Sequence, residues 1–108
     1  MTYKEIADII ESIGLPNAYY EFPDDTQLEP PFICFYYPES DDLYADNKNY
    51  AKIRRLYVEL YTDNKDFDNE AAVESALTSN GLSFRKSELY INNERMWQIT
   101  YQTEVVIS

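Results

Sequence analysis

A two-residue alternation near the end of the chain constrains its fold more than any other feature. From position 97 to 107, apolar or core-compatible side chains occupy every second position, and mostly polar ones fill the positions between them. Successive side chains of a β-strand point to opposite faces, so the pattern predicts a strand over about 94–107 with one face on a hydrophobic core. The predicted core-facing positions are Trp97, Ile99, Tyr101, Thr103, Val105 and Ile107.

Two other segments repeat with the period of a helix. In residues 2–13, isoleucines recur at i, i+3, i+4 and i+7, while Thr2 and Glu5 have the spacing of a capping box. Residues 66–80 carry a second apolar stripe after a run of acids suited to a helix start. Gly14 and Gly81 follow these segments as expected helix ends. The stripe residues are Ile6, Ile9, Ile10 and Ile13 in the first helix and Val73, Ala76 and Leu77 in the second.

The remaining segments predict further strands joined mostly by short turns. Short apolar or alternating runs occur at 18–22, 32–37, 53–62 and 82–91, and Asn92-Asn93 fits a tight hairpin. Residues 38–52 are polar with interspersed Tyr, which indicates a long connection that is functional or mobile rather than a simple link. The expected fold is α+β, with a mostly antiparallel sheet of about four strands, two helices packed on one face, and a single domain over residues 1–108.

The residue inventory excludes most catalytic and cofactor chemistry. There is no His and one Cys among the 108 residues, so His-based triads and zinc, haem or iron–sulfur centres are not expected. Two isolated Gly residues do not make a phosphate-binding loop, so no cofactor is expected. Cys34 lies inside an apolar strand without a nearby base, which predicts a buried, inert thiol.

Carboxylates are the only plentiful reactive groups, and their best cluster does not match a metal loop. Counting from Asp66, the position that needs Gly in a calcium loop is Ala71, and the final carboxylate position is Leu77. We interpret this cluster as an acid-rich helix start and expect no metal site and no enzyme activity. A small hydrolase with paired carboxylates is kept as a third hypothesis.

The net charge of −11 is concentrated in the first half of the chain. Residues 1–47 hold eleven acidic side chains and one basic one, whereas residues 48–108 hold nine and eight. Such a charge disfavours sequence-specific binding to nucleic acid and binding to anionic membranes. Neither a secretory signal nor a stretch of ~20 apolar residues is present, so we expect a soluble intracellular protein.

The eleven Tyr residues exceed what a core of this size needs. Tyr is enriched at protein interfaces because it combines a large apolar area with a polar tip. We therefore favour an interaction protein over a monomer whose second sheet face is covered by hydrated Tyr.

Several segments together resemble a family of small proteins of tailed phages and prophages of Gram-positive bacteria. They are Pro31-Phe-Ile-Cys-Phe-Tyr-Tyr37, Leu43-Tyr-Ala-Asp-Asn-Lys48, and Val58-Glu-Leu-Tyr-Thr-Asp-Asn-Lys-Asp66, with Glu88–Ile91 and residues 101–106 further on. The family is similar to tail terminator, tail-completion and head–tail joining proteins. The resemblance implies a small α+β fold, assembly as rings that are often hexameric, and no catalytic residue or cofactor. It also implies a place in the virion neck or tail, with the host cytoplasm as the site of assembly.

The resemblance is most specific at residues 45–48 and 59–63, and a loop at 41–50 would reach a neighbouring subunit or the tail tube. Expected partners are therefore other copies of the chain and other phage neck or tail proteins. The acidic first half could stack head-to-tail on the bases of a neighbour, and acids lining a ring would let DNA slide past. The alternative function is a small acidic inhibitor or nucleic-acid mimic that neutralises a basic partner. The candidate interface residues are Asp41, Asp42, Tyr44, Asp46, Asn47, Tyr50, Lys52, Arg54 and Arg55.

Overall fold

A computed structural model describes residues 1–22, 28–38, 43–45 and 48–108, which form two helices and six strands. The predicted α+β class is confirmed, and the strand count is six rather than about four. The helices are α1 (Tyr3–Glu11) and α2 (Phe67–Ser79). The strands are β1 (Asn17–Tyr19), β2 (Phe32–Tyr36), β3 (Leu43–Ala45), β4 (Lys48–Thr62), β5 (Phe84–Ile91) and β6 (Met96–Ile107).

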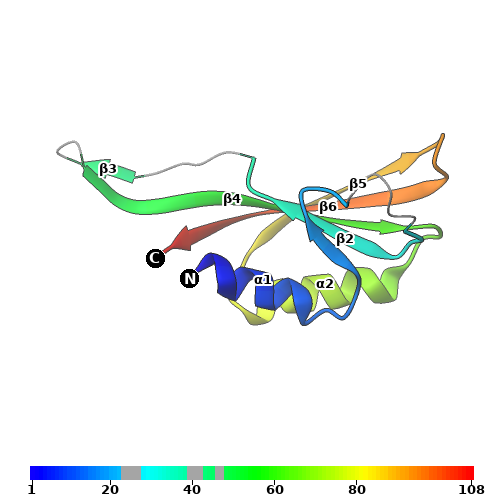
Figure 1. The fold of residues 1–108 in the computed structure, drawn as a ribbon, viewed down its shortest axis with the longest axis horizontal. Coiled ribbons are helices and arrows are strands. Elements are labelled where there is room, and N and C mark those ends of the chain that lie inside the picture. Colours follow the sequence, from blue (N-terminus) through cyan, green and yellow to red (C-terminus); the bar gives the residue numbers. More distant parts are fainter. Residues whose placement is uncertain (23–27, 39–42, 46–47) are drawn as a thin grey trace.

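The strands form one sheet in the order β1-β2-β4-β6-β5, with β3 added to the start of β4. All described neighbours are antiparallel except β1 and β2. The central pair is β4 and β6, which are in register from Lys52 opposite Ile107 to Thr62 opposite Trp97. Both helices lie on the same face of the sheet (Figure 1), as the sequence predicts. The other surface of the sheet is called the open face below.

The core lies between the helices and the sheet. It contains most of the predicted stripe positions of both helices and most of the alternating positions of β4 and β6. The predicted core positions Ile13, Ala76 and Trp97 are only half-buried. Burial of one such aliphatic side chain contributes about 1.5–3 kcal/mol, so this layer accounts for most of the fold's stability. The core residues are Ile6, Ile10, Ile33, Phe35, Leu56, Val58, Leu60, Val73, Leu77, Leu82, Ile99, Tyr101, Val105 and Ile107.

Local signals at the helix starts are confirmed. The Thr2 hydroxyl accepts a hydrogen bond from Glu5 N at 3.1 Å, and the Glu5 carboxylate accepts one from Thr2 N at 3.1 Å. The Asp66 carboxylate caps α2 by accepting from Asn69 N at 3.0 Å. The acid cluster before α2 therefore includes a helix cap, which is the structural interpretation favoured over a calcium loop.

The interpretation of residues 38–52 as a connection is wrong for much of that segment. β3 and the first residues of β4 pair with each other there, with Leu43 opposite Ala51 and Ala45 opposite Lys48. A two-stranded ribbon can satisfy its backbone hydrogen bonds without an apolar alternation, so the polar composition did not reveal it.

The β5–β6 hairpin also differs in detail from the expected one. Its strands meet at Ile91 opposite Met96, so the turn has four residues rather than two. The positive φ of 52° falls on Arg95, and neither Asn92 nor Asn93 adopts one. At β1, Tyr20 has φ of 70° and ends the strand before the predicted position 22. Each of these changes alters a turn and leaves the strand order unaffected.

Candidate interaction surface

The first structural feature suited to a partner is an arm formed by β3 and residues 48–51 of β4. Lys52 is paired with Ile107, the last residue of β6, so the part of β4 before Lys52 extends past the end of β6. Figure 1 shows the arm projecting beyond the helices at one end of the molecule, whose extents are 50 × 29 × 22 Å. Because the arm extends away from the compact body, it is able to contact another molecule.

The structure brings only some of the predicted interface residues together. Tyr44 lies in β3 and Tyr50 in the arm part of β4, while Lys52, Arg54 and Arg55 follow at the base of the arm. Lys52 is exposed, and Arg54 and Arg55 are half-buried. The predictions for Asp41, Asp42, Asp46 and Asn47 fall outside the described residues.

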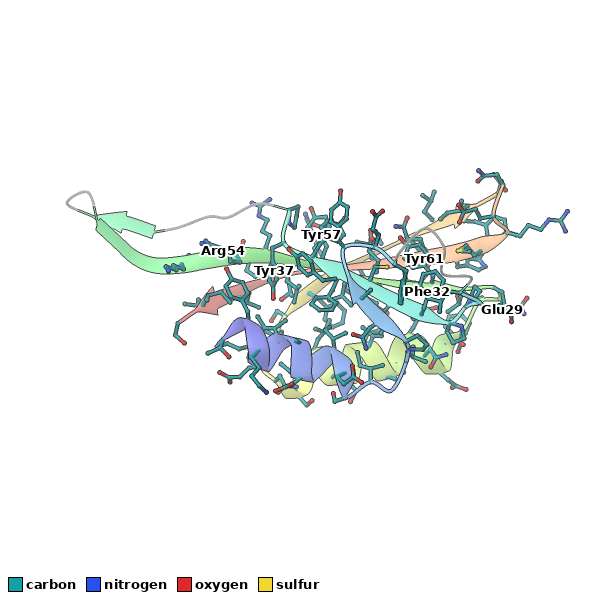
Figure 2. The ribbon with its side chains drawn as sticks, viewed as in Figure 1. Glu29, Phe32, Tyr37, Arg54, Tyr57 and Tyr61 are labelled. Atoms are coloured by element: carbon teal, nitrogen blue, oxygen red, sulfur yellow. The ribbon has the colours of Figure 1, made fainter. Side chains whose placement is uncertain are left out.

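The base of the arm is fixed to the first helix. The Arg54 guanidinium donates a hydrogen bond from Nε to Tyr3 Oη at 3.1 Å, and Tyr3 packs edge-on against Tyr37 at 5.1 Å between ring centroids. Figure 2 shows Arg54 and Tyr37 on neighbouring parts of the structure near α1. Arg54 is therefore partly a structural residue that fastens β4 to α1.

The second feature is the open face, where a carboxylate lies among aromatic rings. The register of β2, β4 and β6 places Cys34, Glu59 and Thr100 in one row across the sheet. Because side chains two residues apart share a face, the flanking residues of β2 and β4 lie on the same surface. These are Phe32 opposite Tyr61 on one side of Glu59, and Tyr36 opposite Tyr57 on the other.

The rings on the open face contact each other. Phe32 and Tyr61 are stacked with centroids 4.9 Å apart, and Tyr36 lies 5.5 Å from Tyr57. Figure 2 shows Phe32, Tyr57 and Tyr61 along the central strands. All four rings are half-buried although both described helices are on the other face. Part of this burial comes from the same chain, because Tyr20 packs against Tyr36 with centroids 5.5 Å apart and Phe22 packs against Phe32 at 5.6 Å. We call Glu59 and these four rings the Glu59 cluster.

Glu59 is held by neutral donors alone among the described residues. It accepts hydrogen bonds from Gln98 Nε2 at 2.9 Å, Tyr61 Oη at 3.2 Å and Tyr36 Oη at 3.4 Å. Burial raises the pKa of Glu59, and the hydrogen bonds from these three side chains offset only part of that effect. The charge of Glu59 thus remains without a neutralising partner in the described part of the chain.

The pKa values of two titratable groups beside Glu59, the Tyr36 hydroxyl and the Cys34 thiol, are also raised. Burial, with the charge of Glu59 as a further cause, raises the pKa of Tyr36 to about 12 and that of Cys34 to about 11. The Cys34 thiol therefore stays protonated at neutral pH, which agrees with the inert thiol predicted from sequence.

On the helix side, another carboxylate is surrounded by cations. The Glu70 side chain is 2% exposed and lies 2.7 Å from Lys65 Nζ and 2.8 Å from Lys86 Nζ. Burial alone would raise the pKa of Glu70, but the hydrogen bonds and charges of the two lysines outweigh it and lower the pKa. Lys86 also pairs with Glu74, so the network fastens α2 to β5.

Sequence reasoning did not identify Glu59 or the Glu70 network as distinctive. In the sequence, Glu59 alternates with Tyr57 and Tyr61 along a predicted strand, and Glu70 follows other acids at a predicted helix start. Lys65 and Lys86 are 21 residues apart in sequence, so no local spacing signals that they meet at one carboxylate. The alternation of Tyr57, Glu59 and Tyr61 was the available signal for the open-face cluster.

The described residues contain no group of three or more Cys, Asp or Glu side chains arranged to hold a metal ion. None of the helices in the described part of the chain is long and apolar enough to cross a membrane.

Comparison with known proteins identifies the fold. No protein-family model and no curated protein matches the chain. Among solved structures, the chain is similar to a protein chain in the "Virion of native gene transfer agent (GTA) particle". The TM-score is 0.66 at 14% sequence identity, and the match covers 97% of this chain and 87% of the other. At that identity the likeness establishes a shared fold over nearly the whole chain.

Proposed function

We propose that the protein is a structural, non-enzymatic component of a phage or prophage particle. In this proposal it acts at the neck, as a tail terminator, tail-completion or head–tail joining protein. The observation that carries the proposal is the fold shared, over 97% of the chain, with a protein of a gene transfer agent virion. The sequence resemblance to neck proteins of tailed phages is an independent reason for the same assignment.

The arm suggests how the protein would work. A strand pair that extends past the body of one subunit can add its contacts to the next subunit without altering the core of either. A surface at one end of a chain that meets a different surface on the next copy gives a heterologous contact, which closes into a ring when the rotation permits. We propose ring self-assembly of this kind, a hexamer being the form that the resemblance implies.

The exposed acids of α1 suit a surface that DNA passes. Glu5, Asp8 and Glu11 are exposed on the first helix, and Lys4 is paired with Asp8 at 3.0 Å. If this surface lines a ring, phosphates are repelled and DNA slides past without binding. Self-assembly and contacts with other neck proteins then constitute the function, and catalysis has no part in it.

The test is the assembly state of the purified protein over a range of concentrations, measured by sedimentation velocity and electron microscopy. Wild-type protein is expected to form rings. A variant with residues 41–50 replaced by a short Gly-Ser linker is expected to stay folded by circular dichroism and to remain monomeric. A wild-type protein that is monomeric at every concentration, and absent from purified virions, would refute the proposal.

The acidic-inhibitor alternative predicts a different result. The same exposed acids of α1 would then bind a basic protein with an affinity that falls steeply as salt is added. Rings that form equally well at low and high salt, together with no retention on a basic protein column, would leave the structural role as the better explanation.

A further inference from the structure

The Glu59 cluster has the composition of a site for a cation. A half-buried carboxylate without a cationic partner retains an uncompensated desolvation cost, which a positive charge placed beside it would reduce. The faces of Tyr and Phe rings also attract cations, with about 0.5–2 kcal/mol gained per contact. Glu59 has four such rings around it and no ammonium or guanidinium within ion-pair distance in the described residues.

The chain provides a cation of suitable position, but on another copy. Lys52 is exposed and makes no ion pair among the described residues. It lies in the same strand as Glu59, seven residues away, so the two are about 24 Å apart at ~3.4 Å per residue. An odd separation also places them on opposite faces of the sheet. Lys52 of one chain therefore cannot reach Glu59 of the same chain.

The orientation of Lys52 fits a contact between copies. Its register partner Ile107 is part of the core, so Lys52 points to the helix side of the sheet, at the base of the arm. If the arm of one copy lies across the open face of the next with the helix side of β4 turned toward it, Lys52 faces the Glu59 cluster. The contact joins two different surfaces, which is the heterologous geometry of a ring.

We propose that Lys52 of one copy binds the Glu59 cluster of the next copy, with its ammonium beside the Glu59 carboxylate and against the tyrosine rings. This inference rests on the proposed self-assembly and names the pair of surfaces that would form it. Arg54 stays on its own chain in this arrangement, because its guanidinium already donates to Tyr3.

The experiment is a charge exchange measured by sedimentation equilibrium at several concentrations. Lys52→Glu and Glu59→Lys, each alone, are expected to weaken self-association at least about tenfold, because each places like charges opposite each other. The double variant restores opposite charges and is expected to recover to within about threefold of wild type. Lys4→Glu and Glu94→Lys, which change exposed charges elsewhere, serve as matched controls and should leave self-association unchanged.

A neutral pair of variants keeps the test valid if Glu59→Lys does not fold. Lys52→Gln and Glu59→Gln should each weaken association, and the double variant should weaken it no further than the stronger single change. This inference is overturned if the double charge exchange self-associates as weakly as the single variants, or if the effects of the two neutral changes add. Ring assembly itself would then remain supported by the wild-type protein. A monomeric wild-type protein overturns both proposals.

Discussion

Two glutamates on opposite faces of one sheet have opposite electrostatic surroundings. Glu70, on the helix side, is nearly inaccessible and contacts two lysines, and its pKa is lowered. Glu59, on the open face, is half-buried among hydroxyl and amide donors, and its pKa is raised by burial. The first carboxylate is neutralised by two lysines, whereas the second has no cationic partner among the described residues.

We propose that this difference separates the part of the molecule that folding completes from a part that binds a partner. Charges buried inside a stable domain are paired, since an isolated one costs several kcal/mol. The Glu70 network satisfies that rule through α2 and β5. The Glu59 cluster satisfies it only partly among the described residues, which is the physical reason for proposing that the open face is an interface.

Removal of the Glu70 carboxylate is the largest expected effect on stability. Glu70→Ala should lower the free energy of unfolding by about 3 kcal/mol, because it leaves two partly buried lysines without their shared anion. Chemical denaturation at pH 7 measures the loss. Glu88→Ala is the matched control, since Glu88 pairs with Lys65 in the same network but is 45% exposed, and its cost should stay within about 0.5 kcal/mol.

The pH dependence follows from the lowered pKa of Glu70. Glu70 contributes fully to the free energy of unfolding at a pH above its unfolded-state pKa near 4.5. This contribution is lost as the pH falls through the lower pKa of Glu70 in the folded state. The stability difference between wild type and Glu70→Ala should therefore shrink on acidification below pH 4.5. A difference that grows in acid would contradict the pairing.

A smaller effect is expected from the hydroxyl that joins β6 to the same network. Tyr101 is fully buried, and its hydroxyl donates to Glu74 at 2.8 Å. Tyr101→Phe should cost about 1–2 kcal/mol, because a buried hydrogen bond to a charged acceptor is lost. Tyr57→Phe is the control on the open face, where the described residues offer its hydroxyl no hydrogen bond, and it should leave the unfolding midpoint unchanged.

The smallest effect has the opposite sign and concerns the open face. In the monomer at pH 8, Glu59→Gln should raise the free energy of unfolding by about 0.5–1 kcal/mol, because it removes a half-buried charge. The amide oxygen of the new side chain can still accept from Tyr36 and Gln98, and its NH2 group can donate to the Tyr61 hydroxyl. The raised pKa means that the protonated carboxyl suits the fold better. Wild type accordingly loses stability relative to the variant as the pH rises from about 4.5 through the folded pKa.

Thermal unfolding of both proteins at pH 4 and pH 8, under conditions where each is monomeric, measures this difference. The unfolding temperatures of wild type and Glu59→Gln should be nearly equal at pH 4, and that of the variant should be higher at pH 8. A Glu59→Gln protein that is less stable than wild type at pH 8 would show that the carboxylate is a completed structural element, and the comparison with Glu70 would fail.

Prediction from sequence succeeded where the signal was local. The capping box of Thr2 and Glu5, the isoleucine stripe of α1 and the alternation in β6 depend on residues a few positions apart, and all three are confirmed. The arm was missed because strand pairing there is carried by backbone hydrogen bonds in a polar segment. The Glu70 network was missed because its members come from a loop, a helix and a strand.

By itself, the sequence determined the α+β class, both helix starts, the core positions and the absence of His-based chemistry, because these depend on composition and on the periods of helix and strand. Only the tertiary structure decided that β4 extends past β6 as an arm, that two lysines meet at Glu70, and that Glu59 lies among four rings with no cation of the described residues beside it. Those features depend on strand register and on the packing of distant segments, which place charges together or apart in ways that no local pattern records.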